Sequence, residues 1–152
     1  IFKKILKEGN SFIPITHPDM TRFWITLEQG VNFVLSSFLG MKGGEIFIPK
    51  IPSMKVTDLA SSIAPKIKQK TIGIRPGEKL HEIMITKEDA LSTFEFKDRY
   101  IILPNNVYKY KNRKYLYNKI KGKKVVSNFE YSSDNNPKWL NNKLLKQMLN
   151  EK

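Results

Sequence analysis

The sequence has 152 residues, 40% of them hydrophobic and 11% aromatic, and this length and apolar content predict a globular domain rather than a disordered chain. It contains no cysteine, which excludes disulfide bonds, thiolate catalysis and thiolate metal sites. The net charge of +13 suggests nucleic-acid binding, whereas the longest apolar runs are far shorter than the roughly 20 residues that cross a bilayer, so we expect no membrane partner.

The N-terminal residues begin inside a regular element. Residues 1–9 carry apolar side chains at the spacing of the last turns of a helix and end in a glycine. A chain that starts within a helix predicts a fragment of a longer protein. Two short apolar runs follow at 11–16 and 20–25, separated by a turn that contains proline, and each predicts a strand.

Two amphipathic helices and a strand are predicted next. Residues 26–40 start with a Thr-x-x-Gln capping box and form a helix with an apolar face at Leu27, Val31, Val34, Leu35 and Phe38. Residues 45–49 are rich in residue types that favour β-strands and predict a strand. Ser53 is a candidate N-cap for a second helix, which ends before Pro65 and has an apolar stripe at Val56, Leu59, Ala60, Ile63 and Ala64.

Residues 71–84 are the stretch most suggestive of a ligand site. A β-branched run ends in Arg75, a Pro-Gly turn follows, and we predict that a short helix starts near Glu78 with Leu80, Ile83 and Met84 buried. An arginine beside a helix start can hold a phosphate or diphosphate. Glu78 can accept hydrogen bonds from sugar hydroxyls. Residue types alone also fit two surface charges on an ordinary loop.

The basic excess is concentrated in the last third of the chain. After a strand predicted at 95–103, residues 105–124 form a basic loop or hairpin, and residues 108–124 hold eight lysines and arginines and no acid, interleaved with four tyrosines, at positions 108, 110, 115 and 117. Aromatic rings among cations are typical of single-stranded nucleic-acid binders. The alternative is a solvated charged face, which the lysine-rich composition favours, so we expect no nucleic-acid partner.

The C-terminal tail predicts a closing helix. Residues 132–137 resemble a helix cap, and the apolar face that follows consists of Leu140, Leu144, Leu145, Met148 and Leu149. The economical division of this α/β chain is a substrate-binding region at 1–104, the basic segment at 105–124 and the tail at 125–152. No dinucleotide, P-loop or nucleophile-elbow motif occurs, and we assign no catalytic, cofactor-binding or metal-binding residue.

Several motifs in order resemble the C-terminal half of inverting UDP-N-acetylglucosamine 4,6-dehydratases. The resemblance covers nearly the whole chain outside the basic segment, and its motifs are Pro14-Ile15-Thr16, the runs at 20–26, 43–47 and 49–54, Gly73-Ile74-Arg75-Pro76-Gly77-Glu78-Lys79-Leu80-His81-Glu82, the run at 129–136 and Trp139-Leu140. Another nucleotide-sugar epimerase or dehydratase of the same superfamily is the alternative, beside the basic nucleic-acid-binding module.

The resemblance implies an α/β fold, the substrate-binding portion of an extended short-chain dehydrogenase/reductase whose Rossmann core, with NADP and the catalytic groups, precedes residue 1. It also implies a cytoplasmic homo-oligomer that makes a 4-keto-6-deoxy sugar nucleotide for surface or flagellar glycans of the pseudaminic acid type. Carried over to this sequence, Arg75 matches the arginine at the UDP diphosphate. Glu78 and Thr16 match substrate-binding residues, and Arg22 is a further pocket candidate. We therefore expect the chain to bind a UDP-sugar and to be inactive alone.

Overall fold

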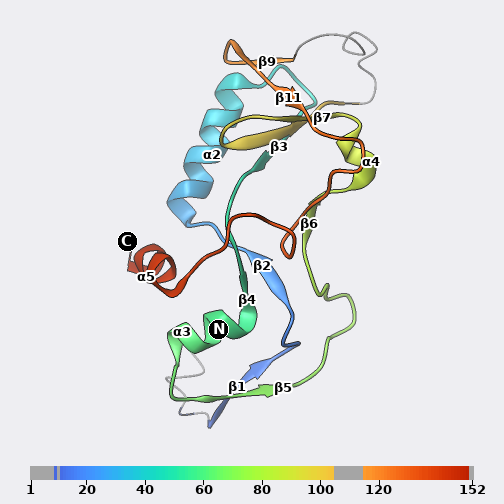
Figure 1. Cartoon of the computed structure of the whole chain (residues 1–152). Coiled ribbons are helices and arrows are strands. Elements are labelled where there is room, and N and C mark those ends of the chain that lie inside the picture. The colour runs from blue at the N-terminus through green and yellow to red at the C-terminus, as the bar shows by residue number, and fades with distance from the viewer. Residues whose placement is uncertain (1–8, 10, 105–114, 151–152) are drawn as a thin grey trace. The chain divides into compact units, whose positions relative to one another are not determined.

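The computed structural model describes residue 9 and residues 11–104 and 115–150 (Figure 1). The chain forms two compact units. The first combines the described parts of Ile1–Trp24, Pro52–Glu82 and Ser132–Lys152, and the second combines Ile25–Ile51 with the described parts of Ile83–Tyr131. Each unit is therefore assembled from segments that are far apart in the sequence. The helix predicted for residues 1–9 lies outside the described residues.

The first unit contains two strand pairs and two helices. Strands β1 (Phe12–Ile15) and β5 (Lys68–Thr71) are parallel, and β2 (Thr21–Phe23) is antiparallel to β4 (Ser53–Lys55). Helix α3 (Val56–Ile63) buries its predicted stripe in two clusters. One cluster joins it to β1, and the other joins it to helix α5 (Asn142–Asn150); the buried members are Ile13, Ile15, Ala60 and Ala64 in the first and Met54, Leu59, Leu140 and Leu145 in the second.

The second unit is built on a four-stranded antiparallel sheet. Its order is β11-β7-β8-β3, formed by Lys123–Lys124, Thr93–Glu95, Arg99–Ile102 and Ile46–Pro49 respectively. Helices α2 (Leu27–Gly40) and α4 (Lys87–Ala90) and a hairpin of β9 (Leu116–Tyr117) and β10 (Ile120–Lys121) complete the unit. Strand β6 (Ile83–Ile85) pairs with β12 (Tyr131–Ser132).

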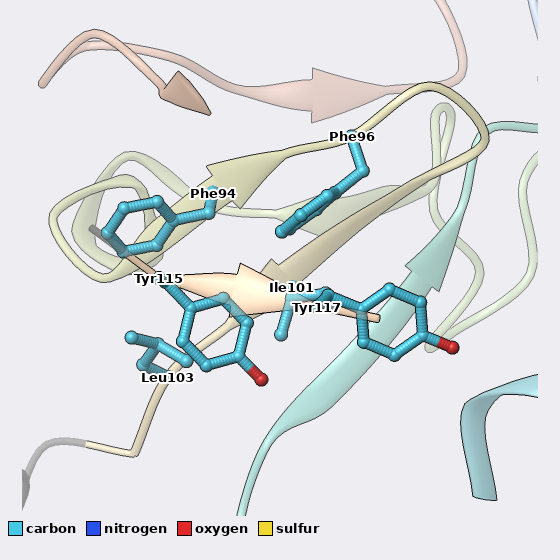
Figure 2. Packing of buried hydrophobic residues seen from close by; sticks show 6 residues of the cluster. All are labelled: Phe94, Phe96, Ile101, Leu103, Tyr115 and Tyr117. Atoms are coloured by element: carbon cyan, nitrogen blue, oxygen red, sulfur yellow. The ribbon is translucent and has the colours of Figure 1, made fainter. Parts of the chain in front are cut away.

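The core of the second unit is aromatic. Figure 2 shows the rings of Tyr115 and Tyr117 packed with Phe94 and Phe96, around Ile101 and Leu103. The Phe96 ring contacts both tyrosine rings edge to face, with centroid distances of 6.2 and 5.8 Å. Such contacts add to the free energy gained by burying the rings. The basic hairpin is thereby anchored to the sheet by its tyrosines.

The capping box predicted for α2 is confirmed, because the Thr26 hydroxyl accepts from the Gln29 amide and the Gln29 side chain accepts from the Thr26 amide. The predicted apolar face is also present, but no described residue buries it. Leu27, Val34 and Phe38 are 85%, 64% and 71% exposed. Across the described residues, no helix combines the length and apolar character that crossing a membrane would need.

Outside the 72–82 loop, three predicted details are wrong. Ser53 does not cap α3, whose N-cap is Lys55, but lies buried in β4. The strand predicted at 95–103 is a hairpin, because the backbone turns back between β7 and β8. Residues 132–137 comprise the end of strand β12 and a turn at 133–135 rather than a helix cap, and α5 begins later, where the Asn141 side chain accepts from the Leu144 amide. In the first and third cases, other segments recruit polar side chains that local patterns assigned to helix caps.

Candidate functional site

The loop of residues 72–82 starts at the carboxyl end of the parallel pair β1–β5. Ile15 lies opposite Thr71, and the Ile72 amide donates to the Ile15 carbonyl over 2.8 Å. Thr16 directly follows β1, so it stands at the same edge of the pair as the start of the loop. The carboxyl ends of parallel strands are where α/β proteins commonly place ligands. The structure thus brings Thr16 next to the loop that carries Arg75 and Glu78.

Arg75 and Glu78 are the ends of a closed turn. The Glu78 amide donates to the Arg75 carbonyl over 3.0 Å, and the Glu78 carboxylate accepts from the Arg75 amide over 3.1 Å. Gly77 has a φ of +83°, which a residue with a side chain adopts only with strain. The turn is therefore shaped by its own residues, and both charged side chains are exposed.

The helix predicted to start near Glu78 is absent. Residues 78–82 form no helix, and residues 83–85 belong to strand β6. The physical reason is that backbone groups of this segment bond to other parts of the first unit instead of to one another. An anion at Arg75 would consequently meet the guanidinium without the help of a helix N-terminus.

Arg22 supports the loop from strand β2. Its guanidinium donates to the carbonyls of Lys79 and Leu80 over 2.8 and 3.1 Å and to its neighbour Thr21 over 2.7 Å. Its Nε lies 3.5 Å from the Glu82 carboxylate, and its side chain is only 23% exposed. In contrast, no described residue forms a hydrogen bond or ion pair with the Arg75 guanidinium. The pocket role expected for Arg22 stays a prediction, and its observed contacts are with the loop backbone.

A buried hydroxyl junction closes the far end of the loop. Thr21 Oγ1 lies 2.8 Å from His81 Nδ1 and 2.6 Å from Ser133 Oγ. Ser133 also accepts from the Glu82 amide over 2.9 Å, and its own amide donates to the Glu82 carbonyl over 2.8 Å. Sequence reasoning missed Thr21 and Ser133 because small uncharged residues in turns carry no chemical signature, and their burial arises only in the folded unit.

Charged groups near the junction show no metal centre. Within the part of the chain that the structure describes, no three histidine or acidic residues form a metal-binding group. The Ser132 hydroxyl donates to the Asp134 carboxylate and lowers the pKa of Asp134, which holds that group as an anion. His17, a turn residue, accepts from the Asp19 amide.

The tyrosines of the basic segment do not form a stacking surface where the structure describes them. Tyr115 and Tyr117 are 1% and 6% exposed, and their hydroxyls donate to Glu45 and to the Ser36 carbonyl. Buried rings with satisfied hydroxyls cannot stack on nucleic-acid bases. The tyrosines at 108 and 110 lie outside the described residues. This geometry counts against the nucleic-acid interpretation.

Comparison with known proteins gives consistent matches. The family model described as "Polysaccharide biosynthesis protein" matches residues 1–104. Two curated relatives named "UDP-N-acetylglucosamine 4,6-dehydratase (inverting)", from Campylobacter jejuni serotypes O:2 and O:23/36, are 54% and 52% identical over 98% of this chain. The chain spans only 45% of the length of each. The match to the X-ray structure of Pen from Bacillus thuringiensis covers 97% of this chain and 42% of the Pen chain, with 29% sequence identity and a TM-score of 0.76.

Proposed function

This chain belongs to the polysaccharide biosynthesis protein family, and we propose that it is the nucleotide-sugar-binding part of an inverting UDP-N-acetylglucosamine 4,6-dehydratase. The observation that carries the proposal is 54% identity over 98% of the chain to a relative of that name. The resemblance seen in the motifs is confirmed by these matches, as is the α/β fold class of an extended short-chain dehydrogenase/reductase portion.

In the proposed site, Arg75 is the diphosphate ligand. Its guanidinium is exposed and unpartnered among the described residues, so its fork of donors is available for paired, charge-assisted hydrogen bonds to phosphate oxygens. Glu78 has one carboxylate oxygen engaged by the Arg75 amide and a second one for a sugar hydroxyl. The hydroxyl of Thr16 faces no protein partner in the described part of the chain. Together they offer one cationic, one anionic and one neutral hydrogen-bonding group for a UDP-sugar.

NADP does not fit the Gly43-Gly44 pair. Gly43 and Gly44 connect helix α2 to strand β3, whereas dinucleotide loops connect a strand to a helix. The Glu45 carboxylate accepts from the amides of Lys42 and Gly43, which occupies the donors that a phosphate would need and adds a negative charge. We propose that NADP and the catalytic groups belong to the part of the longer relatives outside the matched region.

The proposal extends to the biological setting that the resemblance implies. The product would be a 4-keto-6-deoxy sugar nucleotide for pseudaminic-acid-type glycans, made by a cytoplasmic homo-oligomer. The absence of cysteine suits a reducing compartment.

Calorimetric titration of UDP into the longer protein that contains this chain tests the site. Replacing Arg75 with alanine should weaken UDP binding by about 1.5–3 kcal/mol, because a charge-assisted pair to the diphosphate is lost. Lys79→Ala is the matched control, since it removes the same charge from the same loop. Equal affinities for the Arg75→Ala and unmodified proteins would remove Arg75 from the site.

A separate assay tests whether the catalytic groups lie outside this chain. We expect the purified 152-residue chain to form no 4-keto product from UDP-N-acetylglucosamine and NADP, whereas the longer protein does so. Product formation by the 152-residue chain alone would show that this chain holds catalytic groups.

A further inference from the structure

The 72–82 loop has little apolar anchoring, so polar contacts must fix its position. Ile72 and Ile74 are 45% and 46% exposed, and every residue from Thr71 to Lys79 is exposed. At its start the loop is tied to β1 by the Ile72 amide. At its end, directly after Glu78, the tethers among the described residues are hydrogen bonds and one ion pair to two distant segments.

These tethers hold Lys79, Leu80 and Glu82 by their backbone and His81 by its ring. The carbonyls of Lys79 and Leu80 accept from the Arg22 guanidinium, and the Thr21 amide also donates to Leu80 over 3.1 Å. Glu82 exchanges a pair of bonds with Ser133, which is 0% exposed. Thus strand β2 holds the first half of the segment, and the C-terminal tail holds the second half.

The side-chain hydroxyls link the two tethers and have a defined direction. Ser133 Oγ accepts from the Glu82 amide, which leaves its hydrogen for Thr21 Oγ1. Thr21 then donates to Nδ1 of His81, so His81 carries its ring hydrogen on Nε2. The opposite direction would leave the buried Ser133 hydroxyl hydrogen without an acceptor among the described residues, which is unfavourable.

We propose that Ser133 is a positioning residue for nucleotide-sugar binding. It acts through Thr21 and the Glu82 backbone to hold the end of the loop and so fixes Arg75 and Glu78 relative to Thr16. This inference rests on the proposed function of that loop. The turn between Arg75 and Glu78 keeps its own shape through two internal hydrogen bonds. Loss of Ser133 would therefore displace an intact turn rather than unfold it.

The test uses the longer protein and compares two adjacent buried serines. Ser133→Ala should weaken UDP binding roughly five- to tenfold, which is the effect of one or two lost hydrogen bonds. Ser132→Ala is the control, because Ser132 is equally buried but its hydroxyl bonds to Asp134 and not to the loop. KM for UDP-N-acetylglucosamine should rise as UDP affinity falls, while kcat and NADP affinity stay unchanged. A purely structural defect would lower UDP affinity, kcat and NADP affinity together.

A double-mutant cycle shows whether the effect passes through the turn. In a Glu78→Ala background, Ser133→Ala should have a smaller effect on UDP affinity than in the unmodified protein. If Ser133→Ala does not fold, Thr21→Val removes the hydroxyl link at similar volume, and Thr21→Ser should restore affinity.

Full UDP affinity in Ser133→Ala, or in Thr21→Val, would overturn the positioning role even where Arg75→Ala binds weakly. Unchanged UDP affinity in Arg75→Ala would instead remove Arg75 from the proposed site, and this inference would fall with that assignment.

Discussion

Helix α2 contains two glycines, Gly30 and Gly40. Replacing each with alanine compares the helix preference of the backbone with the cost of packing an added side chain. A Cβ at Gly40 would lie 2.2 Å from Cε2 of the Tyr117 ring, whereas a Cβ at Gly30 would meet, beyond its own helix backbone and chain neighbours, no atom of the described residues within 4 Å. The Tyr117 ring cannot move away easily, because it is 6% exposed, donates to the Ser36 carbonyl over 2.7 Å and accepts from Arg99 over 3.0 Å. Alanine is therefore expected to act with opposite sign at the two sites.

The magnitudes decide the sign. Carbon atoms in contact prefer about 3.5–4.0 Å, so the Gly40→Ala side chain requires a shift of more than about 1 Å in a packed aromatic core. Overpacking of this kind costs about 1–3 kcal/mol. Alanine gains at most about 1 kcal/mol over glycine in a helix interior, and less at the last helical residue. We expect Gly40→Ala to lower the free energy of unfolding by about 1–2 kcal/mol and Gly30→Ala to raise it by up to about 1 kcal/mol.

Guanidinium chloride unfolding followed by far-ultraviolet circular dichroism measures both variants. The midpoints of Gly40→Ala and Gly30→Ala should fall on opposite sides of the parent midpoint, with similar slopes. In a Tyr117→Leu background the penalty at Gly40 should shrink, because the obstructing ring is gone. A Gly40→Ala protein as stable as Gly30→Ala would refute the packing argument.

Two titrations probe ionisable groups of the second unit. The hydrogen bond from Arg99 lowers the pKa of Asp98 below its usual 3.8. The ionised Asp98 therefore stabilises the fold above pH 3.8, and this stabilisation is lost as pH falls through the folded pKa. Asp98→Asn should flatten the curve of unfolding free energy against pH below 3.8, and an unchanged curve would contradict this. Burial raises the pKa of Tyr131 from 10.0 to about 12, so its stabilisation is complete below pH 10.0 and is lost as pH rises toward 12. Burial also raises the pKa of Tyr100, so absorbance at 295 nm should show tyrosines that ionise late and the loss of one late ionisation in Tyr131→Phe; an identical titration in that variant would refute the assignment.

Local sequence signals predicted elements that form within a few residues. The capping box at Thr26 and the strand at 46–49 depend on neighbouring side chains and on β-branched composition, and both are present. The apolar stripe of α3 was also predicted, and its residues are members of two hydrophobic clusters. Periodicity could not show what covers the face of α2, since a pattern identifies an apolar surface but not its neighbour.

The candidate site divides in the same way. Arg75 and Glu78 were identifiable because charged residues around a Pro-Gly turn carry a chemical signature. The helix expected after them fails because its backbone is taken by Arg22, 57 and 58 residues away from the carbonyls that it binds, and by Ser133, 51 residues from Glu82. Hydrogen bonds of this range leave no trace in a local window of sequence.

The three-segment construction of the first unit sets an order of folding. Met54 and Leu59 complete their cluster only with Leu140 and Leu145. The Ser53 carbonyl likewise accepts its hydrogen bond from the Leu140 amide. During synthesis these partners emerge after the 72–82 loop, so the loop leaves the ribosome long before Ser133 can hold Glu82. Ribosome-bound chains that stop before residue 133 should expose this loop to proteolysis.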